Sequence, residues 1–223
     1  MELNFESWMT DLERFATWEE EWIKQNQALA EISDRNHNVI EQLLQSGETI
    51  QLELGAGSEQ CREGWTTVDM FPGCDLQLDL REPLPFPDES ISMIYSSHVL
   101  EHFAYPQPMK NLLSECYRVL KKNGIFSVCV PNARIYIEAY LNPEKFESEK
   151  YCLYQPAYNY NSPIDYINYI AYMAGHHCHM FDQKNLLAIL QNIGYSKVEL
   201  RDFDPTIDLE ARKHESIYAE AKK

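Results

Sequence analysis

Apolar residues recur at three- and four-residue steps through the first part of the chain, which is the period of an amphipathic helix. The first stripe consists of Phe5, Trp8, Leu12, Phe15, Trp18 and Trp22. A second, shorter stripe precedes Gly47, a residue typical of helix C-termini, and consists of Val39, Ile40, Leu43 and Leu44. We therefore predict an N-terminal helical cap over residues 1–47 that packs on the main domain. A dimer interface and a substrate lid are the alternative roles.

From Thr49 onwards, short apolar runs alternate with helical patterns. The runs predict strands at 49–54, 66–69, 75–80, 91–95, 125–130, 198–200 and 216–219. Helical faces follow over 109–120, before Gly124, and over 182–194. Strands that alternate with helices are typical of an α/β fold with a doubly wound, mostly parallel sheet. Such a sheet binds its ligand at the carboxyl ends of the strands, where the strand order reverses.

Composition narrows the possible partners. The chain has 223 residues, with 19 Lys and Arg against 35 Asp and Glu, and a net charge of −16. This length favours one domain with additions. The negative charge repels phosphate backbones and anionic lipid surfaces, so we expect no non-specific nucleic-acid binding and no membrane association. No apolar run approaches the length of a membrane span.

The cysteines and the N-terminus indicate a compartment. Six cysteines are present, and Cys116 and Cys129 lie inside apolar patterns where a reduced thiol behaves as a small apolar group. The acidic start of the chain resembles neither a secretory signal nor a transit peptide. We therefore expect a reduced, cytoplasmic protein.

A glycine turn after the first predicted strand indicates a ligand that approaches the backbone. Gly55-Ala56-Gly57 lacks the third glycine of a dinucleotide site, and Glu59 would repel a pyrophosphate. S-adenosylmethionine has a ribose and an adenine but no phosphate, and its sulfonium cation suits an acidic lining. Asp69 and Asp79, which end the next two predicted strands, are suited to the ribose hydroxyls and the adenine amino group.

These features together resemble class I S-adenosylmethionine-dependent methyltransferases, most closely the compact type 11 branch that often accompanies polysaccharide genes. The resemblance is based on ELGAG at 53–57, Gly64-Trp65 through Asp69, DL before LPFPDESISMIYSSHVLEH at 79–102, and RVLKKNGIF at 118–126. It covers residues 48–223, which we take as the S-adenosylmethionine-binding methyltransferase domain, and it does not extend to the N-terminal helices.

The resemblance implies a Rossmann-like sheet of seven strands with the last one antiparallel. It also implies roles for individual residues. Glu53, Gly55 and Gly57 would hold the methionine part of the cofactor, and Asp69 would hold the ribose. The adenine and the remaining cofactor contacts would fall to Met70, Asp79, Leu80 and Ser97.

Histidines follow the fourth predicted strand in the sequence His98-Val99-Leu100-Glu101-His102. The stretch matches a zinc-hydrolase motif, but prolines 106 and 108 would end the long helix that such a hydrolase needs. It also resembles the E-x-x-E-H motif of metal-dependent O-methyltransferases, some of which add a later histidine. In that interpretation the ligands of a divalent metal ion are His98, Glu101, His102 and His179. Residues 177 and 179 would point the same way if their segment is extended.

Two interpretations need no metal. His98, His102 or His179 could act as the catalytic general base that removes a hydroxyl proton, since the pKa of histidine lies near neutral pH. Alternatively, these histidines could be structural, and methyl transfer would then depend on orientation of the reactants.

An insertion at 133–175 holds nine of the fourteen tyrosines, with asparagine and proline between them. Tyrosine suits sugar rings because it offers an apolar face and a hydroxyl, although the tyrosines of a helical lid could also pack on one another. We predict an enzyme that methylates a hydroxyl of a sugar-like small molecule, and a homodimer is possible. The alternative is a non-catalytic module that binds S-adenosylmethionine and a partner.

Overall fold

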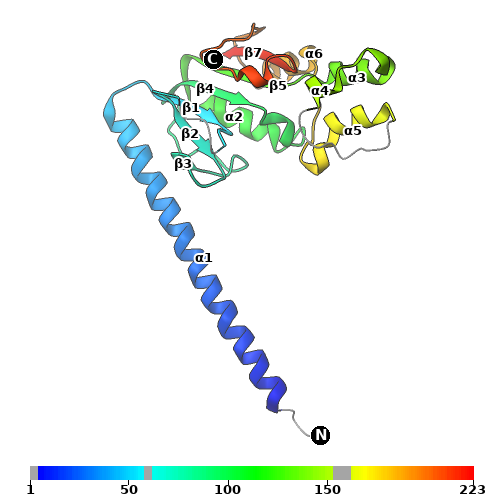
Figure 1. The fold of residues 1–223 in the computed structure, drawn as a ribbon. Helices are drawn as coiled ribbons and strands as arrows, with labels where there is room; N and C mark the ends of the chain where they lie inside the picture. Colours follow the sequence, from blue (N-terminus) through cyan, green and yellow to red (C-terminus); the bar gives the residue numbers. More distant parts are fainter. Residues whose placement is uncertain (1–4, 58–61, 153–161) are drawn as a thin grey trace.

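The computed structural model describes residues 5–57, 62–152 and 162–223, and for residues 5–20 and Trp22 it describes the backbone alone. Helix α1 runs from Phe5 to Ser46 as one continuous helix and projects away from the rest of the molecule (Figure 1). The helix ends before Gly47, whose positive φ of 72° is typical of a left-handed C-terminal residue. The predicted tryptophan stripe thus lies on a helix, but its side chains are outside the described part.

The sheet has seven strands in the order β3-β2-β1-β4-β5-β7-β6. Six strands are parallel, and β7 runs antiparallel to both β5 and β6, which confirms the predicted fold class. The strands are β1 Gln51–Leu54, β2 Thr66–Asp69, β3 Leu76–Gln77, β4 Ile91–Ser97, β5 Leu120–Pro131, β6 Lys197–Leu200 and β7 Ser216–Lys222. The order reverses direction beside β1, where the glycine turn lies.

The remaining helices connect these strands. They are α2 Met109–Val119, α3 Ala133–Leu141, α4 Ser148–Tyr151, α5 Ile164–Tyr172 and α6 Gln183–Ile193. Short 3-10 turns lie at η1 Leu100–His102, η2 Pro143–Lys145, η3 Met173–Gly175 and η4 Glu210–Arg212. Helix α6 begins at Asp182, whose side chain accepts a hydrogen bond from the Asn185 amide, and ends before left-handed Gly194. Both caps agree with the sequence prediction.

The predicted boundaries differ from the structure in two places. Strand β3 is only Leu76–Gln77, because the chain turns at Asp79, whose carboxylate accepts from the Arg81 amide. Helix α2 ends at Val119 rather than near Gly124, and β5 begins at once. A Cβ on Gly124 would lie 2.8 Å from the Lys121 carbonyl oxygen, so this glycine is needed for a close backbone approach within β5.

The core lies between the sheet and its helices. Helices α2 and α6 pack on each other and bury apolar residues that include Leu113, Cys116 and Leu190. The thiols of Cys116 and Cys129 are buried and unpaired, as predicted. None of the described helices is long and apolar enough to cross a membrane.

The insertion forms a separate small cluster beside the main core. Tyr136 and Tyr169 are buried there against each other, with ring centroids 5.5 Å apart. Phe146 packs on Tyr136, Tyr151 and Tyr166. Tyr154, Tyr158 and Tyr160 lie outside the described residues, whereas Tyr140 and Tyr172 are exposed. Packing among the tyrosines, one of the two predicted roles, therefore accounts for the buried ones.

Helix α1 joins the domain through its last turns alone. Ile40 is buried in the core, and Val39 and Leu43 pack against it. The buried Asn36 side chain donates to the Gln77 carbonyl oxygen (2.8 Å) and accepts from the Gln77 amide (3.1 Å). This pair satisfies both backbone groups of Gln77 on the edge strand β3. The predicted packing as a cap therefore holds for the C-terminal part of the helix, while Glu21 and residues 23–31 are exposed.

Removal of the Asn36 amide should weaken the connection between helix and sheet. Asn36→Ala leaves both backbone groups of Gln77 without a protein partner, and we expect a loss of about 1–3 kcal/mol in the free energy of unfolding in urea. Asn38→Ala, an exposed change on the same helix, controls for helix propensity. Equal stability of the two variants would contradict the role of Asn36.

Candidate functional site

The two predicted glycines at the end of β1 have different structural roles. A Cβ on Gly55 would collide with Cγ2 of Val99, so Gly55 is required by packing of the turn after β4. Gly57 has φ of 65°, and no atom of the described residues beyond its chain neighbours lies within 4 Å of the place that its Cβ would occupy. Gly57 therefore leaves open space beside the backbone, as a ligand cradle requires. Glu59 lies outside the described residues.

Asp69, at the end of β2, holds the glycine turn. Its Oδ2 accepts from the Gly57 amide (2.9 Å), and its Oδ1 accepts from the Phe71 amide (3.1 Å). The residue is buried, at 8% exposure. Because each carboxylate oxygen has two lone pairs, both oxygens can accept another hydrogen bond from a ligand.

The chain after β2 provides an apolar rim. Met70 and Phe71 are exposed at 55% and 61%, which is unusual for large apolar side chains at the end of a buried strand. Asp79 and Arg81 form an ion pair near β3, and hydrogen bonds from Arg81 hold the pKa of Asp79 below its usual value. Asp79 therefore stays a carboxylate, and the buried Leu80 follows it.

Glu53 is buried near the centre of the sheet beside Arg62. The two side chains form an ion pair, and the Arg62 guanidinium lies 5.1 Å from the centroid of the Tyr95 ring. Burial raises the pKa of Glu53, although Arg62 and Arg212 both act to lower it. The Glu53 side chain is therefore already paired with a cation of this chain, at the base of the glycine turn.

Arg212 is a residue that the sequence analysis missed. It lies on η4 just before β7, and its Nη1 donates to the Ser97 carbonyl oxygen (2.8 Å) and to Ser97 Oγ (3.0 Å). Burial raises the pKa values of Glu53, Glu101 and Glu215, and the positive charge of Arg212 counteracts part of that rise. Nothing local marks Arg212, because its partners are more than 100 positions away along the chain. Ser97, predicted to bind the cofactor, is engaged with it.

His98 reaches the site by a route that differs from the prediction. It does not share a helix face with Glu101 and His102, because its φ is 55° and the helical turn η1 begins only at Leu100. Its Nε2 lies 2.8 Å from Ser216 Oγ, and its Nδ1 lies 3.7 Å from Glu101 Oε1. Burial lowers its pKa well below the usual value, so His98 is neutral.

Glu101 and two histidines form a group at the turn η1. The Glu101 carboxylate is buried, with Oε1 3.9 Å from His102 Nε2, and burial raises its pKa to about 8. The rings of His102 and His177 lie edge to face, 5.1 Å apart. The ligand atoms of Glu101, His102 and His177 all lie within 4.8 Å of one another.

His179 does not join this group, which corrects the predicted ligand set. Its Nε2 lies 3.0 Å from Asn185 Oδ1, and its ring packs on Tyr105 and Phe181. The predicted alternation of 177 and 179 fails because this segment is not extended as a strand. The Cys178 and His179 amides both donate to the Glu101 carbonyl oxygen, and this tight turn brings His177 alone over His102.

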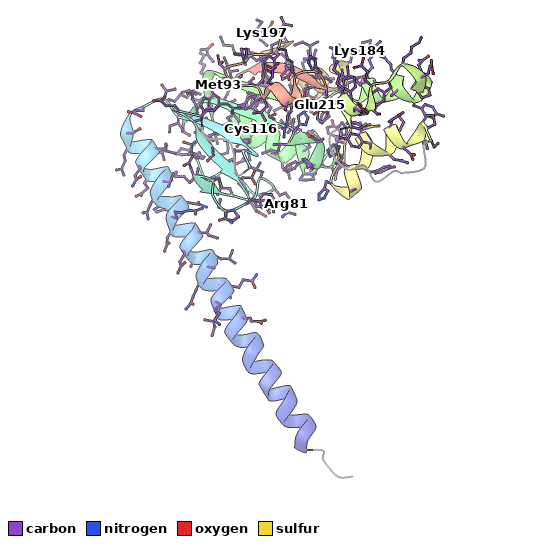
Figure 2. The ribbon with its side chains drawn as sticks, in the orientation of Figure 1. Arg81, Met93, Cys116, Lys184, Lys197 and Glu215 are labelled. Atoms are coloured by element: carbon purple, nitrogen blue, oxygen red, sulfur yellow. The ribbon has the colours of Figure 1, made fainter. Side chains whose placement is uncertain are left out.

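A pocket of about 350 Å³ opens beside this group. Its lining includes His98, Glu101, His102, Tyr136, Tyr169 and His177. Arg212 and Glu215 complete the polar part, and Glu215 lies just before β7, next to the insertion (Figure 2). Arg81 lies on the β3 side of the molecule (Figure 2). The candidate site therefore has two halves along one sheet: the glycine turn with the acids near β2 and β3, and the pocket beside Glu101.

Comparison with known proteins explains the glycine turn and the strand ends. Residues 55–128 match the family model described as "Methyltransferase domain". This part of the chain is therefore similar to methyltransferase domains. The match includes Gly55, Asp69, Asp79 and the turn that carries His98 and Glu101, but neither α1 nor the histidines near 177.

One curated relative also matches the methyltransferase domain. A probable S-adenosylmethionine-dependent methyltransferase from Mycolicibacterium smegmatis is 34% identical over 62 residues, which are 28% of this chain and 23% of that protein. The matched stretch thus spans about a quarter of the relative.

Solved structures are similar in fold. A methyltransferase from Archaeoglobus fulgidus has a TM-score of 0.50 at 19% identity and covers 85% of this chain and 92% of its own. An S-adenosylmethionine-dependent methyltransferase from Mesorhizobium loti has a TM-score of 0.51 at 16% identity, over 79% of this chain and 92% of its own.

The buried Glu53 should make stability depend on pH. Its pKa in the folded protein is raised above the usual 4.5, so the folded state binds more protons than the unfolded state between these two values. Stability should therefore fall as the pH rises above about 4.5 and level off above the raised pKa. Glu53→Gln should remove this contribution in urea unfolding from pH 4.5 to 7, whereas exposed Glu63→Gln should keep it. A Glu53→Gln profile parallel to wild type would contradict the assignment.

Proposed function

We propose that this chain is an enzyme that transfers the methyl group of S-adenosylmethionine to a hydroxyl of a sugar-like small molecule. The observation that carries the proposal is the Asp69 carboxylate on the Gly57 amide at the strand ends. Asp69 is a buried hydrogen-bond acceptor beside an open glycine turn, in the part of the chain that matches the methyltransferase model. This similarity supports the cofactor, and the acceptor is inferred from the pocket.

The residues at the strand ends fit S-adenosylmethionine. Asp69 has lone pairs left for the ribose hydroxyls, and the exposed apolar side chains of Met70 and Phe71 offer a surface for the adenine. The ionised Asp79 can accept from the adenine amino group. The buried Glu53 would face the positively charged methionine end. When bound, the cofactor supplies an electrophilic methyl group.

The pocket next to Ser97 and His98 fits a polyhydroxyl acceptor. Arg212 and Glu215 can donate to and accept from hydroxyls, and Tyr136 and Tyr169 provide aromatic surface. His102 is the predicted histidine best placed as a base, because its Nε2 makes no hydrogen bond to another described residue and its side chain is 42% exposed. In the metal-free protein it would take the proton of the acceptor hydroxyl. His98 would then hold Glu101 and Ser216 in place.

Cofactor binding should depend on the apolar rim as well as on Asp69. Met70→Ala removes exposed surface, so the fold should be unchanged while S-adenosylmethionine affinity falls about 5- to 20-fold in calorimetric titration. Asp69→Ala should weaken binding further. Leu200→Ala, an exposed apolar change on β6 at the other edge of the sheet, should bind as wild type does. Wild-type affinity in both variants would place the cofactor elsewhere.

Turnover should depend on His102. We expect His102→Ala to lower kcat about 10²- to 10⁴-fold without change in S-adenosylmethionine affinity, while exposed His37→Ala on α1 has no effect. The assay follows transfer of a labelled methyl group to a panel of sugars, amines and thiols. Transfer to amines or thiols alone would overturn the hydroxyl assignment. Cofactor binding without any turnover would favour the non-catalytic binding module.

We also propose that α1 pairs with a second copy of this chain. Its 42 residues extend about 63 Å, and its apolar residues Trp8, Phe15, Trp22 and Leu29 recur at intervals of seven, the repeat of a coiled coil. Adjacent Ile23 and Leu29 are exposed at 43% and 57%, beyond the part of the helix that packs on the domain. A second α1 would cover the same stripe.

Association should be lost when charge replaces the exposed apolar side chains in and beside this stripe. Ile23→Glu with Leu29→Glu should convert a dimer to a monomer in light scattering after size exclusion. Gln27→Glu with Asn38→Glu adds the same charge outside the stripe and should remain dimeric. A monomeric wild type at high concentration would refute the pairing.

A further inference from the structure

Three metal-ligand side chains converge at the floor of the pocket. Their ligand atoms, from Glu101, His102 and His177, all lie within 4.8 Å of one another. Metal bonds of about 2.0–2.2 Å place neighbouring ligand atoms roughly 3–4 Å apart. The 3.9 Å between Glu101 Oε1 and His102 Nε2 already lies in this range. Small side-chain rotations would bring the ligand atom of His177 into the same range.

Hydrogen bonds decide which nitrogen of each ring is free. His102 Nδ1 lies 2.9 Å from the His176 carbonyl oxygen, and His177 Nδ1 lies 2.8 Å from the Ile170 carbonyl oxygen. A carbonyl oxygen only accepts, so each Nδ1 carries the proton. The ring nitrogen left to offer a lone pair to a metal is therefore Nε2 in both histidines. A backbone carbonyl that orients a ligating histidine in this way is the usual outer-shell arrangement of metal sites.

The Glu101 carboxylate lacks the partner that its burial demands. Its side chain is 2% exposed, and Oε2 has no hydrogen bond among the described residues. A buried, unpaired carboxylate oxygen is costly unless a donor or a cation satisfies it. When Glu101 is ionised, two imidazole lone pairs and this oxygen face one another, and all three are acceptors.

The surrounding backbone holds the group together. The Glu101 carbonyl oxygen accepts from the Cys178 and His179 amides, at 2.7 and 3.1 Å, which joins the end of β4 to the histidine segment. Met173 and Ala174, which line the pocket and lead into this segment, have positive φ values of 37° and 53°. Such backbone strain in residues other than glycine occurs mainly at functional sites.

We propose that Glu101, His102 and His177 bind a divalent first-row transition metal ion. Two imidazole nitrogens and one carboxylate are the ligand set of open zinc and iron sites, where water or substrate takes the remaining positions. The pocket supplies this access. The nearby charged and titratable groups are Arg212, Glu215, His98 and His176. Arg212 and Glu215 act on the Glu101 carboxyl in opposite directions.

A metal ion at this site would also have a role in the proposed methyl transfer, and this role rests on the proposed function. A metal ion in the pocket binds acceptor oxygens and lowers the pKa of a hydroxyl, so it would replace His102 as the means of activating the acceptor. Metal binding itself does not depend on methyl transfer, and it can be measured without the cofactor.

Titration of the full-length, EDTA-dialysed chain with Co²⁺ tests the site. We expect visible absorption bands that saturate at one Co²⁺ per chain and are displaced by Zn²⁺. His177→Ala and the nearly isosteric Glu101→Gln should each weaken Co²⁺ binding more than about 100-fold. His179→Ala is the matched control, because His179 is two residues away and bonds to Asn185, and it should bind Co²⁺ as wild type does.

Three results would overturn the proposal: no Co²⁺ binding by wild type, wild-type affinity in both Glu101→Gln and His177→Ala, or an equal loss in His179→Ala. S-adenosylmethionine titration of the same samples separates the two proposals. Intact cofactor binding without Co²⁺ binding rejects the metal site alone. Co²⁺ binding without cofactor binding rejects the methyltransferase function and leaves the metal site standing.

Discussion

The architecture of the pocket depends on one backbone interaction, in which the Glu101 carbonyl oxygen accepts hydrogen bonds from the Cys178 and His179 amides. This contact spans more than 70 residues of sequence and closes the insertion over the end of β4. It sets His177 against His102 and leaves His179 outside. Together with the hydrogen bond between His102 Nδ1 and the His176 carbonyl oxygen, it fixes how the histidines of the two segments lie at the floor of the pocket.

The two halves of the site are built on different principles. On the β1–β2 side, rigid backbone forms the surface: a glycine turn is held by Asp69, and short strands end together. On the β4–β5 side, buried charged and polar side chains such as Glu101 and Glu215 form the surface, and Arg212 lies between the halves on Ser97. A shared cofactor site and a specialised acceptor pocket would show this division, because the cofactor is constant and acceptors vary.

Helix α1 adds a third feature that neither half requires. Asn36 and Ile40 tie its C-terminal turns to the sheet edge, while Ile23 and Leu29 are exposed on the part that projects from the domain. The pocket beside Glu101 adjoins the insertion, far from β3 in the strand order. Association through α1 would therefore bring domains together without covering the pocket.

Local patterns in the sequence were enough to predict the sheet, the ends of α6 and the place of Asp69 at the end of β2, because each depends on residues close together in the chain. Periodicity marks a buried strand, and a glycine turn marks a positive φ. Arg212 and His177 were beyond such reasoning. Arg212 meets Ser97 only through the return of β7, and His177 replaces His179 because two amide hydrogen bonds tighten the segment. Those contacts join distant segments, so only the tertiary structure decided them.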